Sequence, residues 1–180
     1  MDKYEVLKQY FGYDAFRDGQ EKMIDAITSG RDVLGIMPTG AGKSLCYQIP
    51  ALMAGENGGI TLVISPLISL MKDQVSALNQ AGVHAAYLNS SLTSGQYYKA
   101  LGYAREGRYP IIYVAPERLL TPEFLDFAVH AKIAMVAVDE AHCVSQWGQD
   151  FRPGYLKIEE FLCTLPKRPV VSAFTATATA

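Results

Sequence analysis

Six short apolar segments, separated by longer stretches of helical periodicity, are the feature that most restricts the fold of this 180-residue chain. The predicted strands are 32–37, 60–65, 84–88, 110–115, 133–138 and 170–174. Their almost continuous apolar character is typical of strands covered on both faces. The pattern predicts an α/β fold, a mostly parallel β-sheet with helices on both faces. Right-handed crossovers would place the carboxyl ends of the strands at one edge, where ligands of such sheets bind.

Helices are predicted between these strands and before the first one. After the second strand, apolar residues recur at the helical spacing of 3.6 residues. These residues are Leu67, Met71, Val75 and Leu78. Within the first 30 residues, a short helix is expected to end at Gly12. A second helix is expected to run to Gly30, with Asp18 as its N-cap and Glu21 at N3.

A glycine-rich stretch, residues 37–44 (MPTGAGKS), follows the first predicted strand and opens a helix. Glycines let the backbone wrap an anion, and a helix N-terminus adds a favourable dipole. Lys43 would reach the β- and γ-phosphates of a nucleotide, and Ser44 would bind magnesium. The predicted nucleotide-binding residues of this loop are Thr39, Gly40, Ala41, Gly42, Lys43 and Ser44. The alternative is a glycine-rich turn that only caps a helix, and Met37 stands where the usual pattern has its first glycine.

Two acidic residues follow the fifth predicted strand, in the sequence Asp139-Glu140-Ala141-His142. Asp139 would hold Mg²⁺, and Glu140 would polarise the water that attacks the γ-phosphate. His142 could link this site to its surroundings, although a histidine in isolation is more often structural. The alternative for the acidic pair is an N-cap of a following helix. We expect these acids and Lys43 to lie at adjacent strand ends and to share one triphosphate.

Several motifs resemble those of the RecQ family of DNA helicases, and together they cover nearly the whole chain. They are Phe11-Gly12-Tyr13 with Phe16-Arg17 and Gln20, then 37–47, 65–75, 115–119, 139–142, 143–153 and 173–178. The RecQ form of the glycine-rich motif begins with Met and Pro, which accounts for Met37. The stretch 143–153 resembles the aromatic-rich loop that separates RecQ enzymes from other helicases. Gln149 and Phe174 depart from the His and Leu usual in the family, but neither position supplies a phosphate or metal ligand.

The resemblance implies further site residues. Tyr13, Arg17 and Gln20 would recognise adenine; otherwise Tyr13 is a core aromatic and Gln20 a solvated helix residue. The residues implied in DNA contact or in its coupling to the nucleotide are Ser65, Lys72, Gln74, Trp147, Phe151, Arg152, Thr175 and Thr177. Local packing is the alternative for the two aromatics of this set, and a solvated charge is the alternative for its lysine.

Composition limits the partners and the location of the chain. The net charge is −2, and no run of Lys or Arg is present, so any DNA site would be a shallow groove or half of one. No apolar stretch approaches the ~20 residues of a membrane span, and the N-terminus lacks a signal peptide's apolar core. The three cysteines form no C-x-x-C pair, which argues against a zinc site or a disulfide framework. We expect a cytoplasmic protein, associated with the nucleoid if bacterial.

The resemblance implies an ATP- and Mg²⁺-dependent 3′→5′ DNA helicase of repair and recombination, of which this chain is one RecA-like P-loop domain. Residues 1–30 would form the adenine-recognition helices, and 31–180 the P-loop core. DNA single strands and single/double-strand junctions would be its partners in the full enzyme. The second RecA-like lobe, with its arginine finger, is missing, as in a truncated protein, so hydrolysis by this chain should be weak. A nucleotide-holding binding module and an RNA-remodelling ATPase are the alternatives.

Overall fold

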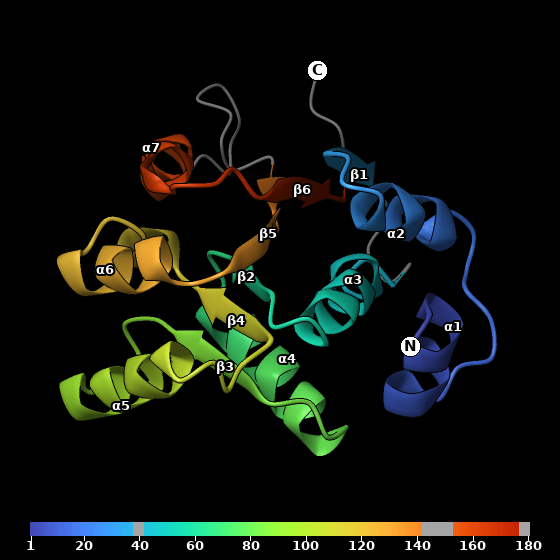
Figure 1. Ribbon diagram of the computed structural model, residues 1–180, viewed down its shortest axis with the longest axis horizontal. Coiled ribbons are helices and arrows are strands. Elements are labelled where there is room, and N and C mark those ends of the chain that lie inside the picture. The colour runs from blue at the N-terminus through green and yellow to red at the C-terminus, as the bar shows by residue number, and fades with distance from the viewer. Residues whose placement is uncertain (38–41, 142–152, 177–180) are drawn as a thin grey trace.

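The structure is a computed structural model, and it describes residues 1–37, 42–141 and 153–176. Six strands of these residues form one parallel sheet with the spatial order β1-β6-β5-β2-β4-β3 (Figure 1). They are β1 (Val33–Ile36), β2 (Ile60–Ile64), β3 (Ala85–Leu88), β4 (Ile111–Val114), β5 (Ile133–Val138) and β6 (Val170–Thr175). The predicted α/β fold with a parallel sheet is confirmed, and each strand matches its predicted range within one residue at either end.

Helices cover both faces of the sheet, so the molecule has three layers (Figure 1). One face carries α1 (Lys3–Val6), the π-helical turn η1 (Leu7–Phe11), α2 (Gln20–Thr28), α3 (Leu45–Gly55) and α4 (Ile68–Gln80). The other face carries α5 (Ser94–Arg105), α6 (Pro122–His130) and α7 (Lys157–Thr164), with the 3-10 turns η2 (Pro116–Arg118) and η4 (Pro153–Leu156).

The core consists of two apolar clusters, one on each face of the sheet. Successive side chains of a strand point to opposite faces, so each central strand contributes to both clusters. In β2, for example, Val63 packs under α3 and α4, whereas Leu62 and Ile64 pack under α5 and α6. This two-sided burial explains why the central strands read as continuous apolar runs in the sequence.

The N-terminal helices agree with the prediction except at one cap. Gly12 ends η1 with φ of 75°, and Gly30 lies just past α2 with φ of 90°, as expected of glycines that stop helices. Asp18 is not the N-cap of α2, so that prediction is wrong. Gly19 occupies the cap position, and the turn before the helix is closed by Gln20, whose Oε1 accepts a hydrogen bond from the backbone N of Arg17 at 2.8 Å.

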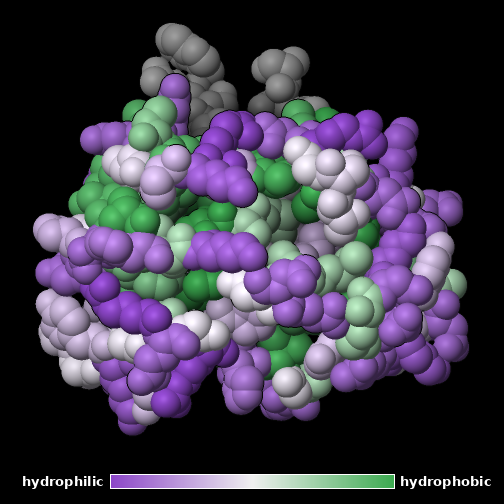
Figure 2. Space-filling model, viewed as in Figure 1, coloured by the Kyte–Doolittle hydropathy of each residue, from purple (hydrophilic) through white to green (hydrophobic). Residues whose placement is uncertain are grey.

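Helix α4 buries three of its four predicted apolar residues, Met71, Val75 and Leu78. The fourth, Leu67, precedes the helix in extended backbone and is 38% exposed, so its inclusion in the buried face is corrected. No helix among the residues described is long and apolar enough to span a membrane. Hydrophilic residues cover most of the face drawn in Figure 2, and hydrophobic ones show between them near α6 and α7.

Candidate active site

The geometry of the site begins with a lysine and two carboxylates. Nζ of Lys43, at the start of α3, lies 3.0 Å from Oδ1 of Asp139 and 3.4 Å from Oε1 of Glu140. The acids follow β5, and the lysine follows β1 and the glycine-rich stretch, so both groups lie at the carboxyl edge of the sheet. The expected meeting of the two motifs is therefore confirmed.

The expectation that these groups sit on adjacent strands is wrong in detail. In the sheet, β6 lies between β1 and β5 and pairs in parallel with both. Nζ of Lys43 nevertheless lies within 3.4 Å of both acids. Thr175, the last residue of β6, thereby comes to the same edge, and its carbonyl accepts a hydrogen bond from the backbone N of Met37 at 3.0 Å.

The backbone begins to turn at Gly42, three residues before α3. Gly42 has φ of 77°, a conformation that residues with a side chain rarely adopt. Its carbonyl accepts from the backbone N of Leu45 at 3.2 Å, and that of Lys43 accepts from the N of Cys46 at 3.1 Å. Ser44 is the N-cap residue, but its hydroxyl does not cap the helix. Its role as a magnesium ligand stays a prediction.

Burial and ion pairing act in opposite directions on the charges of this site. Burial lowers the pKa of Lys43, but the Asp139 and Glu140 carboxylates outweigh it and the pKa of the ammonium is raised. Burial raises the pKa of Asp139, and the Lys43 ammonium only partly offsets this, so the net shift is upward. Burial outweighs the ion pair for Asp139 but not for Lys43, because the Asp139 side chain is only 3% exposed and the Lys43 side chain is 20% exposed. The carboxylate thus depends on a cation nearby to remain charged.

The backbone N, the carbonyl and Oδ1 of Asp139 each have a hydrogen-bond partner. Its backbone N donates to the carbonyl of Ile64 at 2.9 Å, and its Oδ1 accepts from the backbone N of Glu140 at 3.0 Å. Its carbonyl accepts from the hydroxyl of Tyr155 at 2.7 Å. Among the described residues other than glycine, Glu140 alone has a positive φ, of 55°. A buried acid just past the end of β5 is therefore followed by an acid in a strained left-handed conformation.

Of the three residues predicted to recognise adenine, Gln20 contacts the glycine-rich stretch. Gln20, the first residue of α2, is 1% exposed, and its Nε2 donates to the carbonyl of Gly42 at 2.9 Å. The amide of Gln20 thus braces the phosphate loop, a contact that was not predicted from the sequence. Tyr13 is 53% exposed, so the alternative of a core aromatic is excluded for it. Adenine recognition by Tyr13, Arg17 and Gln20 stays a prediction.

The predicted DNA-contacting residues of the 65–75 motif differ in their surroundings. Ser65 is buried, and its Oγ accepts from the backbone N of Leu67 at 3.3 Å, whereas Lys72 is exposed on α4. Gln74 is half-buried, and its Oε1 accepts from the hydroxyl of Tyr47 at 2.7 Å. Of the three, Lys72 alone presents a charge at the surface. Their role in DNA contact stays a prediction.

Tyr47 was not singled out in the sequence, yet it joins the phosphate-loop helix to α4. It lies in the first turn of α3 and is fully buried, and burial raises the pKa of its hydroxyl well above the ordinary value. A second buried pair lies alongside, in which Nε2 of Gln48 donates to the hydroxyl of Tyr113 at 2.9 Å. A polar network therefore runs beneath the site. The sequence signal for it was weak, because isolated tyrosines do not reveal their partners.

Several predicted site residues lie outside the described residues. They are Thr39, Gly40 and Ala41 of the phosphate loop, His142 of the acidic motif, Trp147, Phe151 and Arg152 of the aromatic-rich stretch, and Thr177. Their predicted roles stay predictions.

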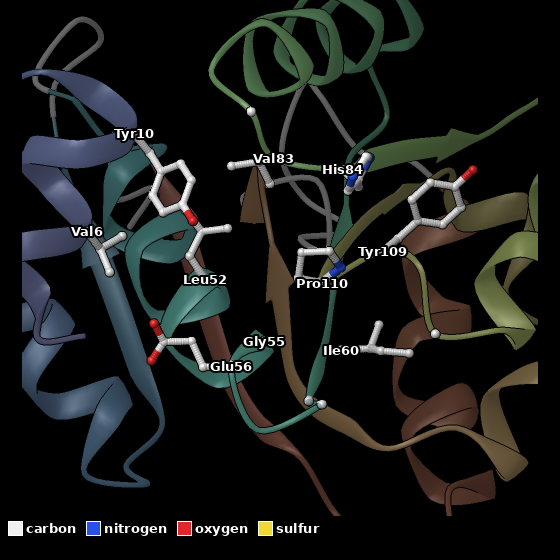
Figure 3. A pocket seen from close by; sticks show the side chains of 14 residues that line it. Val6, Tyr10, Leu52, Gly55, Glu56, Ile60, Val83, His84, Tyr109 and Pro110 are labelled. Carbon is white, nitrogen blue, oxygen red and sulfur yellow. The ribbon is translucent and has the colours of Figure 1, made fainter.

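A pocket of about 260 Å³ opens at the opposite edge of the sheet (Figure 3). It is bordered by Ile60, where β2 begins, and by Pro110, just before β4. Its one carboxylate, Glu56, forms an ion pair with the N-terminal amine at 2.9 Å. Ligands of parallel sheets bind at the carboxyl edge, so this pocket is not the candidate site.

Comparison with known proteins agrees with this geometry. The family model described as "DEAD/DEAH box helicase" matches residues 17–180. The chain is 52% identical over 97% of its length to the ATP-dependent DNA helicase RecQ of Bacillus subtilis, and 49% identical over 96% to that of Haemophilus influenzae. It spans 29% and 27% of those two proteins. The resemblance to RecQ inferred from the motifs is thereby confirmed.

A solved structure supports the fold independently. The helicase MrfA, in a crystal structure with DNA and AMPPNP, superposes with a TM-score of 0.76 over 99% of this chain and 26% of MrfA. The sequence identity is 17%, so this likeness concerns the fold alone.

Proposed function

Because this chain belongs to the DEAD/DEAH box helicase family, we propose that it is the ATP-binding lobe of a DNA helicase similar to RecQ. The observation that carries the proposal is the contact of Lys43 with Asp139 and Glu140 at the carboxyl edge of the sheet. A P-loop lysine, a magnesium-binding acid and a water-orienting acid are the parts that phosphoryl transfer from ATP requires. Here the Lys43 side chain contacts both acids.

In the nucleotide-bound state, Lys43 would exchange its carboxylate partners for the β- and γ-phosphates. The ammonium has a raised pKa and keeps its charge at neutral pH, as an anion-binding group must. The bound triphosphate and its metal would then replace Lys43 as the charges nearest to Asp139. The ion pair of the free protein thus keeps both groups charged and close to where the ligand needs them.

Magnesium fits the donor set of this site. Mg²⁺ usually keeps several waters and takes one or two carboxylates together with substrate phosphates. Asp139 and the hydroxyl of Ser44 would supply such a set, and the ion would neutralise charge on the phosphates. The described residues contain no cluster of three or more His, Cys, Asp or Glu side chains that could hold a metal ion. A magnesium ion bound together with the nucleotide does not need such a cluster, because water and phosphate oxygens supply most of its ligands.

Hydrolysis by this lobe alone is expected to be slow. An arginine finger contributes on the order of 10³–10⁵ in rate, and the motif set of this chain does not include one. We propose that the whole protein supplies it from a second RecA-like lobe and couples hydrolysis to movement along a DNA strand and to duplex unwinding. The two relatives compared above are both named ATP-dependent DNA helicases, and this supports DNA as the polymer.

Nucleotide titration tests the proposal. The chain should bind Mg·ATP, and Lys43→Ala should weaken binding at least tenfold, whereas Lys157→Ala, an exposed lysine of α7, should leave it unchanged. Single-turnover hydrolysis by the wild-type chain should proceed on the order of 10⁻⁴ s⁻¹, the scale of P-loop enzymes without an arginine finger. Absence of Mg·ATP binding would overturn the proposal. Binding without any hydrolysis would favour the binding module.

The choice of polymer is tested with the two-lobe protein. Single-stranded DNA should stimulate its ATP hydrolysis more strongly than RNA of the same length and base composition. Stimulation by RNA alone would instead favour the RNA-remodelling alternative.

A further inference from the structure

The peptide that joins Asp139 to Glu140 is held from both sides. On one side, the hydroxyl of Tyr155 donates to the carbonyl of Asp139 at 2.7 Å. On the other side, the backbone N of Glu140 donates to Oδ1 of Asp139 at 3.0 Å. The backbone turns sharply at this point, because Glu140 has φ of 55°. This peptide orientation sets where the carboxylate of Glu140 lies.

A left-handed conformation is unfavourable for a residue with a side chain, and it persists when the surroundings hold it in place. The two hydrogen bonds supply that restraint. The side chain so placed is the one that lies 3.4 Å from Nζ of Lys43. A change in the peptide orientation would therefore move the Glu140 carboxylate relative to the phosphate-binding lysine.

Tyr155 is rigidly supported. It is 1% exposed, belongs to the apolar cluster beneath α5, α6 and α7, and lies in η4 immediately before α7. The neighbouring Gly154 packs so closely that an added Cβ would lie 3.2 Å from Cβ of Pro116 in η2. The hydroxyl is thus presented by packed elements, as a group that positions an active-site residue should be.

We propose that Tyr155 is a positioning residue for hydrolysis: its hydroxyl holds the Asp139–Glu140 peptide so that Glu140 faces the attacking water. This inference rests on the proposed function and assigns a role to a residue that the motifs left out. Tyr155 itself does not touch the nucleotide. It acts on the hydrolysis step through the orientation of Glu140. Nucleotide binding depends instead on the groups around Lys43.

The alternative is that the hydroxyl merely satisfies a buried carbonyl. Loss of such a hydrogen bond would lower the melting temperature, because a buried carbonyl would be left unsatisfied, with no selective effect on hydrolysis. A test must therefore separate the rate of the chemical step from binding and from folding.

The test compares Tyr155→Phe with wild type by single-turnover hydrolysis of Mg·ATP, at least 15 °C below the lower of the two melting temperatures. Phe keeps the ring and removes only the hydroxyl. We expect the rate constant at saturating protein to fall on the order of tenfold to a hundredfold, part of what general-base catalysis contributes. The protein concentration for half-maximal rate should change less than twofold.

Tyr97→Phe is the matched control. Tyr97 is also buried in the cluster under α5 and α6, at 6% exposure, but it lies on α5, a helix that packs on β3 and α6. Its variant should keep both the rate constant and the half-saturating concentration. Equal changes in rate and half-saturation for Tyr155→Phe, or an unchanged rate, would overturn the inference. A wild-type chain that hydrolyses no faster than Glu140→Gln would instead overturn the proposed function, and the inference with it.

Discussion

Lys43 and Asp139 form an ion pair of 3.0 Å across the end of a strand to which neither residue belongs. The pair is uneven, because the carboxylate is almost fully buried and the ammonium remains partly exposed. The acid therefore depends on the lysine more than the lysine depends on the acid. In the free protein this dependence has consequences for stability that can be measured apart from any activity.

Lys43→Met should destabilise the free protein in a pH-dependent way. Removal of one partner leaves the Asp139 carboxylate buried without its cation, at an expected cost of about 3–5 kcal/mol near pH 8. The folded-state pKa of Asp139 is raised, so the folded protein takes up a proton there at a pH where the unfolded chain is still ionised. The penalty is thus present above that raised pKa and is lost as pH falls through it.

Thermal melts of wild type and Lys43→Met from pH 8 to pH 5 measure this effect. The gap in melting temperature should narrow towards pH 5. The raised pKa of Lys43 does not interfere, because its ammonium is charged over this whole range in the wild type. Lys157→Met should melt like the wild type at each pH, and a constant gap for Lys43→Met would contradict the prediction.

Gly42→Ala should destabilise the chain and weaken nucleotide binding. The backbone at Gly42 has φ of 77°, and an added Cβ would lie 2.3 Å from Nε2 of Gln20. We expect a loss of more than about 1 kcal/mol from the strained φ alone. Gly102→Ala is the control, since its Cβ would meet nothing within 4 Å in the middle of α5. It should stabilise the chain by about 0.5–1 kcal/mol, and denaturant unfolding measures both changes.

Gln20→Ala separates base recognition from support of the phosphate loop. If the amide reads adenine, the variant should lose its preference for ATP over GTP. If it only holds the carbonyl of Gly42, to which it donates at 2.9 Å, binding of ATP, GTP and inorganic triphosphate should weaken by the same factor. We expect both effects, with a greater loss for ATP. Competition titrations of the three ligands give the factors, and an unchanged ATP/GTP ratio would exclude adenine recognition by Gln20.

Lys72→Ala and Gln74→Ala should differ in their effect on DNA binding. Lys72 is exposed, and a lysine that contacts one phosphate contributes about 0.7 to the slope of log affinity against log salt for a single strand. Its removal should lower the slope by about that amount. Gln74 is neutral and accepts a hydrogen bond from Tyr47, so Gln74→Ala should leave the slope unchanged and lower the melting temperature. Fluorescence anisotropy at several salt concentrations distinguishes them, and an unchanged slope for Lys72→Ala would remove it from the DNA site.

The local elements of this fold were predictable because their signals are local. Strands buried on both faces leave continuous apolar runs, and helices on one face leave apolar residues at a spacing of 3.6. The cap of α2 was misplaced by one residue because the side chain of Gln20, rather than that of Asp18, closes the preceding turn. Leu67 was assigned to a helix that begins one residue later. Such errors occur at element ends, where a single side-chain contact decides the boundary.

The amino-acid sequence by itself determined the chemistry of this protein: a lysine after glycines, two acids after an apolar strand, and the order of strands and helices along the chain. Tertiary structure alone decided that β6 lies between the two motifs, that Gln20 braces Gly42, and that Tyr155 holds the peptide before Glu140. The physical reason is the distance along the chain over which each kind of interaction acts. Backbone preferences and hydrophobic periodicity act between near neighbours in the chain, whereas these contacts join residues whose meeting depends on how the whole sheet is assembled.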